Sequence, residues 1–266
     1  GEKPRFWLVN EAGKIAMEMP LDQAPVGDPV PMAGGAVFPL ASKLRLMGLR
    51  TRVEDYLGSV EQNETVQWAH LMPLDDEHIF VVDLKGQVSR VQYRKTPSFH
   101  MQQVDSIEIG KPVDVAPLVL GDRLILTDSS GHTQVLNTSN FEKLAESNLE
   151  VPAVGQLAVA GATLLATTSR GQLLALAIDD NLKQLWSIDL TNDHLSGQPM
   201  TDGERIILGT MNGRVLVLNQ ASGAIEHSVQ LDQPIEHGPL RIGSHLVVTT
   251  TDGSLYRIDT VLEGAE

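Results

Sequence analysis

The sequence predicts an all-β fold, a β-propeller of six or seven four-stranded antiparallel blades. Three observations predict it. Hairpin turns recur at an even spacing, short strands of apolar and β-branched residues flank each turn, and no stretch of ten or more residues has helical periodicity. Four short strands cannot bury both faces of their sheet alone. Stacking such sheets around an axis does so and leaves few exposed edges.

The clearest hairpin turns carry a glycine at the second position of a two-residue loop. They are Lys85-Gly86, Ser130-Gly131, Arg170-Gly171, Asn212-Gly213 and Asp252-Gly253, at intervals of 45, 40, 42 and 40 residues. We expect type I′ turns, because glycine supplies the positive φ that they require. A strand-rich repeat of this length is typical of propellers.

The other strands of each blade, which we name A to D in chain order, follow in phase. Strand A is entered through motifs such as Gly197-Gln198-Pro199 and is joined to strand B by turns such as Gly161-Ala162 and Asp202-Gly203. The glycine hairpins join B to C. A fourth strand, D, lies beyond each hairpin, as at residues 182–190 and 224–232.

The first unit is degenerate. Residues 27–49 align with the last A, B and C strands, with Gly34-Gly35 at the A–B turn and Ser42-Lys43 at the B–C turn. In the following unit, Asp75-Asp76-Glu77 falls in the A–B turn as an exposed charged group. Apolar residues of the first unit and of the segment after it are expected in the core: Leu46, Met47, Leu49, Tyr56 and Leu57.

The chain opens in mid-blade. Residues 6–23 match residues 215–233 almost position for position, so they read as a C and a D strand. We expect one domain over residues 1–266, with ring closure between residues 6–20 and 238–260. Six B–C turns give six blades. The C strand at the start, residues 6–10, is then one strand more than six blades need. Seven blades, or a ring cut from a longer protein, are therefore alternatives.

Composition excludes several classes of function. The formal net charge of −14 and the pI of about 4.9 argue against a nucleic-acid binder and against binding to anionic membranes, both of which favour basic surfaces. The absence of cysteine excludes disulfides, a thiolate nucleophile and cysteine-ligated metals. No apolar run is long enough for a transmembrane helix.

The repeat resembles that of the PQQ-like (quinoprotein-like) propellers. Its best copy, Gly203 to Gly223, has a glycine turn, an apolar strand ending in Thr, a second glycine turn, and an Asn followed by Ser-Gly. Trp186, within 183–189, stands where that family often has a tryptophan packed between blades. The resemblance covers nearly the whole chain. It implies either dehydrogenases that bind pyrroloquinoline quinone or non-catalytic scaffolds, of which the outer-membrane protein assembly lipoprotein is the nearest in type.

The residues do not favour the dehydrogenase alternative. The resemblance implies that an enzyme of this family would be an eight-bladed ring with a vicinal cysteine disulfide, a stacking tryptophan and a Ca²⁺ site. This chain has no cysteine, and its three tryptophans are scattered. It also lacks an HExxH pair, a calcium loop, a phosphate loop and a nucleophile elbow. We therefore expect no enzymatic activity, no cofactor and no catalytic or metal-binding residues.

Two groups of residues are candidates for binding. Polar residues at one position of the repeat, near the start of strand A, are expected to form an axial ring: Asp28, His70, Asp114, Gln156, Gln198 and His237. Hydrogen bonding between blades explains them equally well. Cations on neighbouring C strands are expected to form a docking patch for an acidic partner or a polyanion, although ordinary surface scatter is the alternative: Arg45, Arg50, Arg52, Arg90, Arg94 and Lys95.

The function predicted is that of a rigid, non-catalytic scaffold that presents loops to a protein partner, since binding residues concentrate on loops held by a stiff framework. The alternative is a module that binds a small ligand, or performs quinoprotein chemistry, on the propeller axis. The resemblance implies a bacterial, extracytoplasmic location, in the periplasm or at the cell surface. The start "GEKPRFWLVN" does not have the pattern of a secretory signal, so we expect any such segment to have been removed.

Overall fold

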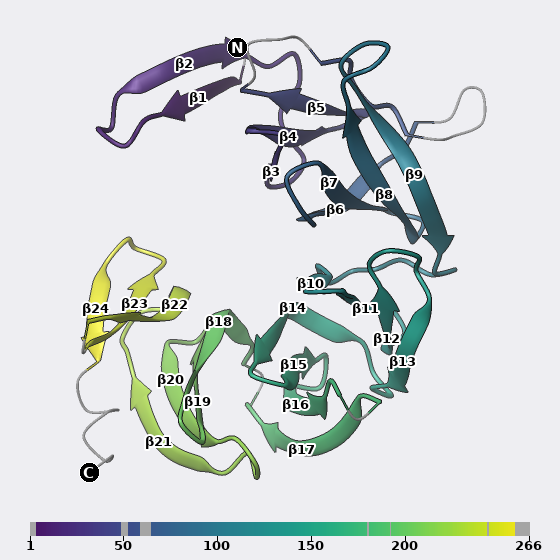
Figure 1. Cartoon of the computed structure of the whole chain (residues 1–266). Helices are drawn as coiled ribbons and strands as arrows, with labels where there is room; N and C mark the ends of the chain where they lie inside the picture. Colours follow the sequence, from purple (N-terminus) through teal and green to yellow (C-terminus); the bar gives the residue numbers. More distant parts are fainter. Residues whose placement is uncertain are drawn as a thin grey trace. The chain divides into compact units, whose positions relative to one another are not determined.

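The structure is a computed structural model in which the strands account for almost all regular structure. It describes residues 4–48, 53–58, 65–179, 181–191, 193–243 and 245–258. Within them, 24 strands form seven antiparallel sheets, and no helix occurs (Figure 1). The all-β prediction is confirmed. Among these same residues, no helix has the length and apolar character needed to cross a membrane.

The chain divides into two compact units, which we call the N-unit (residues 1–124 and 137–142) and the C-unit (residues 125–136 and 143–266). The N-unit holds a two-stranded, a three-stranded and a four-stranded sheet. Their strands are β1 (Arg5–Val9) and β2 (Ile15–Pro20); β3 (Val30–Met32), β4 (Gly35–Leu40) and β5 (Lys43–Met47); and β6 (Trp68–Pro73), β7 (His78–Asp83), β8 (Gln87–Arg94) and β9 (His100–Glu108).

The remaining strands form three four-stranded sheets and one three-stranded sheet, all in sequence order. The boundary between the units runs through the first of them. They are β10 (Leu118–Leu120), β11 (Arg123–Thr127), β12 (His132–Asn137) and β13 (Lys143–Asn148); β14 (Ala153–Ala160), β15 (Thr163–Thr168), β16 (Gln172–Ala177) and β17 (Lys183–Asp189); β18 (Leu195–Asp202), β19 (Arg205–Thr210), β20 (Arg214–Asn219) and β21 (Ile225–Gln230); and β22 (Ile235–Ile242), β23 (His245–Thr250) and β24 (Leu255–Ile258). Four sheets thus have the predicted A-B-C-D order.

The hairpin turns lie where they were predicted, but their geometry differs from the prediction. In each, the glycine amide donates to the carbonyl three residues earlier, as from Gly171 to Thr168 at 2.9 Å. The glycine has positive φ, +74° in Gly171, whereas Arg170 before it does not. These are three-residue loops, a type I turn followed by a left-handed glycine, and not type I′ turns.

The residue that opens each turn holds it in shape. The Asp83 carboxylate accepts hydrogen bonds from the amides of Lys85 and Gln87, at 2.9 and 2.8 Å. The Thr210 hydroxyl accepts one from the Arg214 amide, at 3.1 Å. An Asp or Thr with this role recurs in the repeat because its side chain can bind backbone amides within a turn.

Neighbouring sheets within each unit bury their apolar faces against one another. One core cluster in the N-unit joins residues of β3–β5, such as Leu44, to residues of β6–β9, such as Ile79, both completely buried. In the C-unit, one cluster joins β14–β17 to β18–β21, and another joins β18–β21 to β22–β24. This packing of successive sheets is the physical basis on which the propeller was predicted.

Trp186 has the position that the repeat predicted for it. It lies on β17, only 7% of it is exposed, and its indole nitrogen donates to the Gln220 carbonyl of the next sheet at 2.9 Å. The core prediction is confirmed for Leu46, Met47 and Tyr56 and is wrong for Leu57, which is 61% exposed. Leu49 lies outside the described residues.

The hairpin β1–β2 has the internal geometry of a C–D strand pair. Trp7 lies opposite Glu18 as Leu216 lies opposite Ser228. The register shifts between Leu8 and Val9 in the first pair of strands and between Val217 and Leu218, the equivalent positions, in the second. Asn10 and Asn219 open the two connecting turns in the same way. The pairing within β1–β2 is thus that of a C–D strand pair, and the opening of the chain in mid-blade stays a prediction.

Candidate functional site

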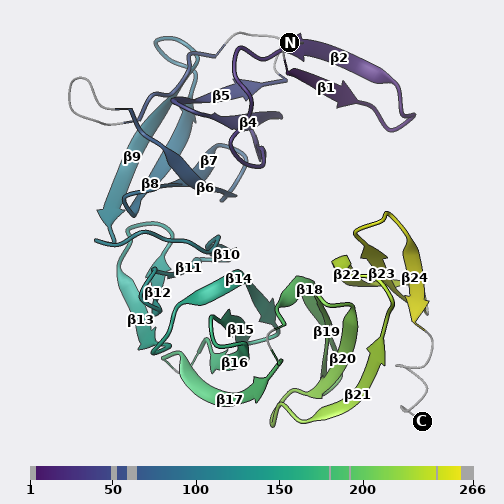
Figure 2. The ribbon, with the colours of Figure 1, turned by 180° about the vertical axis from the view of Figure 1, so that it is seen from behind.

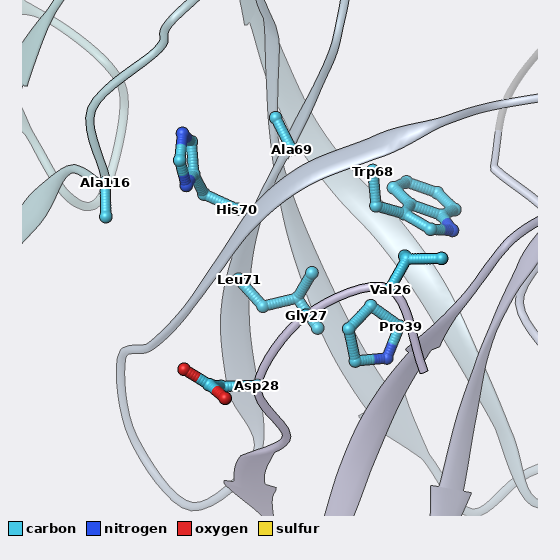
Figure 3. Close-up of a pocket in the computed structure, with 9 residues that line it drawn as sticks. All are labelled: Val26, Gly27, Asp28, Pro39, Trp68, Ala69, His70, Leu71 and Ala116. Carbon is cyan, nitrogen blue, oxygen red and sulfur yellow. The ribbon is translucent and has the colours of Figure 1, made fainter. Parts of the chain in front are cut away.

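Two of the three predicted axial residues of the N-unit, Asp28 and His70, line a small pocket. Asp28 precedes β3 and His70 lies on β6, and both line a cavity of about 210 Å³ together with Trp68, Pro39 and Ala116. Figure 3 shows Asp28 and His70 on one side of this cavity and the Trp68 indole with Pro39 on the other. The volume is below the 300 Å³ or so at which pockets begin to enclose a cofactor or a drug-sized ligand.

His70 fastens its own sheet to the next stretch of chain. Its Nε2 lies 2.8 Å from the Val113 carbonyl oxygen, and since a carbonyl only accepts, Nε2 carries the proton and donates. Burial lowers the pKa of His70, while the bond to Val113 and the charge of Asp114 act in the opposite direction. His70 therefore has a structural role, as a link between its own strand and the backbone at Val113.

The C-unit repeats the same contact two sheets further along the chain. Gln156 Nε2 donates to the carbonyl of Gly197, the residue before Gln198, just as Val113 is the residue before Asp114. Two of the six predicted axial residues thus make equivalent bonds between sheets. The Asp28, Asp114, Gln198 and His237 side chains are exposed. Their gathering into one ring remains a prediction.

The predicted docking patch includes a cation whose charge is neutralised nearby. Arg45 donates two hydrogen bonds to the Asp55 carboxylate, at 2.8 and 2.6 Å, and another to Asp22 at 2.7 Å. Lys43 completes the cluster, 2.6 Å from Asp22 and 3.1 Å from Asp55. Arg45 lowers the pKa of Asp55, and Lys43 lowers that of Asp22. The cluster as a whole carries no net charge.

Arg90 is engaged in a contact between sheets. Its guanidinium donates to the carbonyls of Thr138 and Ser139, at 3.0 and 2.6 Å. Thr138 follows Asn137 as Gln220 follows Asn219, so Arg90 and Trp186 bind the same carbonyl position of the repeat from neighbouring strands. A shared structural role explains Arg90 without a partner protein.

Only part of the predicted patch presents charge to the solvent. Arg94 is exposed at the end of β8, and the Lys95 side chain is 66% exposed, 3.7 Å from Glu77. Lys95 also lies 6.0 Å from the centre of the Tyr93 ring, at the outer limit of a cation–π contact. Arg50 and Arg52 lie outside the described residues.

Two features escaped the sequence analysis. One is the Asp or Thr that opens each hairpin turn, which recurs in the sequence three residues before the glycine. The other is the apolar surface of β1, where Trp7, Leu8 and Val9 are 51, 43 and 53% exposed. Its signal was the reading of β1 as a C strand, which implies a B strand beside it.

Comparison with known proteins supports the architecture. Residues 177–265 match the sequence model of a family described as outer membrane protein assembly factor BamB, which confirms the resemblance to PQQ-like repeats in that part of the chain. No curated protein sequence matches significantly.

Solved structures match over nearly the whole chain. BamB from Moraxella catarrhalis is 16% identical over 94% of this chain and 77% of its own, with a TM-score of 0.73. Sqt1 from Saccharomyces cerevisiae is 14% identical over 94% and 74%, with a TM-score of 0.70. The C-terminal WD40 domain of Sif2 is 14% identical over 97% and 76%, with a TM-score of 0.69. At such identities the likeness shows the fold, a β-propeller, and nothing more.

The described residues do not fit the quinone and calcium site that part of the PQQ-like group implies. No cluster of three or more His, Asp or Glu residues among them is arranged to hold a metal ion. The pocket beside His70, at about 210 Å³, is smaller than the pockets that enclose a cofactor. We assign no chemistry to a quinone in this chain.

Proposed function

We propose that this protein is a non-catalytic propeller scaffold that binds a protein partner. The observation that carries the proposal is the match of residues 177–265 to a family described as an assembly factor. The use of polar side chains supports it, because His70, Gln156 and Arg90 bind the backbone of the next sheet and stiffen the framework. A stiff framework with exposed loops is suited to docking proteins. A structurally similar protein, BBS1N, was crystallised in complex with ARL6DN.

The finer architecture and the location belong to the same proposal. We expect one domain of six blades, or seven if β1 and β2 count as part of another, closed between residues 6–20 and 238–260. The family description favours a bacterial, extracytoplasmic site. Small-angle X-ray scattering of the purified chain tests the ring, because two independent units would give a larger radius of gyration than a closed disc.

The docking surface we propose is the exposed remainder of the basic patch, around Arg94 and Lys95. Arg50 and Arg52, which lie outside the described residues, stay candidates from the sequence. Positive charge on a body with a net charge of −14 gives local contrast that orients an acidic partner. Arg45 and Arg90 are expected to contribute to folding more than to docking, because their charges are already bound.

The experiment is affinity capture from a bacterial envelope extract, followed by binding measurements with the purified partner. Arg94→Glu should lower the association rate at least tenfold at low salt, with a smaller effect at high salt. Lys111→Glu, an equal charge change at another exposed position, should not. Equal losses in both variants would show general electrostatics and would contradict the patch.

The axial-ligand alternative makes a different prediction. A thermal-shift screen that includes pyrroloquinoline quinone with Ca²⁺ should leave the melting temperature unchanged if the chain is a scaffold. A rise of several degrees that His70→Ala abolishes would favour a ligand site and would count against the non-catalytic proposal.

A further inference from the structure

The loop at the end of the β8–β9 hairpin (Figure 2) and the connection after β5 line a hollow. Its volume is about 510 Å³, within the range of roughly 300–1,000 Å³ in which pockets take up a ligand. The residues that line it all belong to the N-unit. They are Glu54, Asp55, Lys95, Pro97, Ser98 and Phe99. The hollow thus lies at the docking surface proposed around Arg94 and Lys95.

Hydrogen bonds hold the two sides of this hollow together. The Glu54 amide donates to the Phe99 carbonyl at 2.9 Å, and the Ser98 hydroxyl donates to the Glu54 carboxylate at 2.8 Å. The Phe99 side chain packs against the N-unit core, and its ring stacks on that of Tyr93 with centroids 6.3 Å apart. The hollow is therefore pre-formed, which lowers the entropic cost of binding there.

Two opposite charges line the hollow. The Lys95 side chain is 66% exposed, and its ion pair with Glu77 is long, at 3.7 Å. Glu54 is also exposed, and one of its carboxylate oxygens, Oε1, accepts the hydrogen bond from Ser98. An ion pair in contact with solvent stabilises little, so Lys95 can exchange Glu77 for an acidic group of a ligand at small cost.

The other lining groups add no net charge. Asp55 belongs to the cluster with Arg45 and Lys43 in which every charge is paired, so it neither attracts a base nor repels an acid. Pro97 and the half-buried Phe99 provide apolar surface. An apolar surface beside one ammonium group and one carboxylate is complementary to an apolar side chain that has an acid on one flank and a base on the other.

We propose that this hollow binds a segment of a partner protein in which an apolar side chain stands between an acidic and a basic residue. The apolar side chain contacts Pro97 and Phe99. The acid pairs with Lys95, and the base pairs with Glu54. This inference rests on the proposed scaffold function and deepens it, because it states what the partner presents to the surface around Arg94 and Lys95. One buried anchor supplies most of the affinity in such a contact, and the charges at its rim supply specificity.

The test uses three short peptides that differ only in charge: Gly-Lys-Phe-Glu-Gly, Gly-Glu-Phe-Glu-Gly and Gly-Lys-Phe-Lys-Gly, each acetylated and amidated. Ligand-observed NMR titrations with the purified full chain give the dissociation constants, in about 0.15 M salt so that the long-range charge of the protein is screened. We expect weak, saturable binding, with the mixed peptide about threefold tighter than either of the others, the effect of one exposed ion pair. Serine in place of phenylalanine should abolish it.

Charge reversal on the protein should change which peptide binds best. Lys95→Glu leaves two acids at the hollow, so the peptide with two lysines should become the tightest ligand. Glu54→Lys should favour the peptide with two glutamates for the same reason. Loss of folding cannot produce such a change, because it would weaken all three peptides alike. Lys111→Glu and Glu108→Lys, equal charge changes at exposed positions beyond the other end of the hairpin, should keep the original order.

Several results would overturn the inference. They are a lack of saturable binding, undiminished binding of the serine peptide, or an order of the three peptides that Lys95→Glu and Glu54→Lys leave unchanged. A concentration-dependent dimer that Lys95→Glu dissolves would also overturn it, since that would assign the hollow to a second copy. If the peptides fail while Arg94-dependent partner capture persists, only this inference is lost and the scaffold function stands.

Discussion

Trp186 offers the sharpest test of how neighbouring sheets are held together. Its side chain is 7% exposed, lies against Gly223 of the next sheet, and donates to the Gln220 carbonyl. Trp186→Ala removes a large buried side chain, which typically costs about 3–5 kcal/mol, and leaves a carbonyl unpaired, which adds about 1 kcal/mol. Trp186→Phe keeps most of the packing and should cost about 1–2 kcal/mol.

The contact with Gly223 provides an internal control. A Cβ on Gly223 would lie 2.5 Å from a ring carbon of Trp186, and the residue has a φ of +72°. Gly223→Ala should therefore carry both a steric and a conformational cost in the natural chain. In the Trp186→Ala background only the conformational cost, about 1 kcal/mol, remains. A double-mutant cycle should show coupling of at least 1 kcal/mol.

The assay is urea unfolding followed by circular dichroism, with the free energy of unfolding taken from the transition of the C-unit. Thermal melting gives a second measure, with an expected fall of about 10 °C for Trp186→Ala. The reasoning is refuted if Trp186→Ala lies within 1 kcal/mol of the natural chain, or if the two costs at 186 and 223 simply add.

Three further predictions concern single positions. Gly131→Ala should destabilise by about 3 kcal/mol and Gly243→Ala by about 1 kcal/mol, because both have positive φ but only Gly131 has a backbone oxygen, that of Val151, 2.4 Å from the added Cβ; equal losses in urea unfolding would contradict this. Arg45 lowers the pKa of Asp55 below 3.8, so this ion pair stabilises the fold above that pH and stops doing so as the pH falls. Asp55→Asn should therefore lower the free energy of unfolding at pH 7 and reduce its loss at acidic pH. An unchanged dependence of stability on acidic pH would count against the pairing. Burial lowers the pKa of His70 below 6.5, so the free energy of unfolding should fall as the pH drops below that value. His70→Gln, which mimics Gln156 at the same repeat position, should keep the stability at pH 7.5 and reduce the loss of stability at pH 5.5. A variant as pH-sensitive as the natural chain would exclude His70 as the cause.

The turns show how far sequence reasoning reaches. Glycine marks the hairpins correctly, because both type I′ turns and type I turns with a following left-handed residue require it. The two geometries differ in the residue that opens the loop. Asp83 accepts hydrogen bonds from the amides two and four residues later, and Thr210 accepts one from the amide four residues later. A recurrent Asp or Thr three residues before each glycine is therefore the sequence signal that separates the two turn geometries.

The candidate site was harder to predict because its partners carry no sequence signature. His70 and Gln156 share a repeat position, which the sequence shows, but each binds a backbone carbonyl, which any residue can provide. Arg45 finds Asp55 and Asp22 through irregular connections, whose course periodicity cannot predict. The same irregularity explains why Leu57 was wrongly expected in the core, since no strand pattern extends to it.

Internal repetition separates structural residues from candidates for function without any related sequence. A contact that recurs at one repeat position, such as the bonds made by Arg90 and Trp186 to the residue after an asparagine, has a structural explanation that needs no partner. By this criterion His70 and Gln156 belong to the framework, because both bind a backbone carbonyl at the start of the next repeat from the same repeat position.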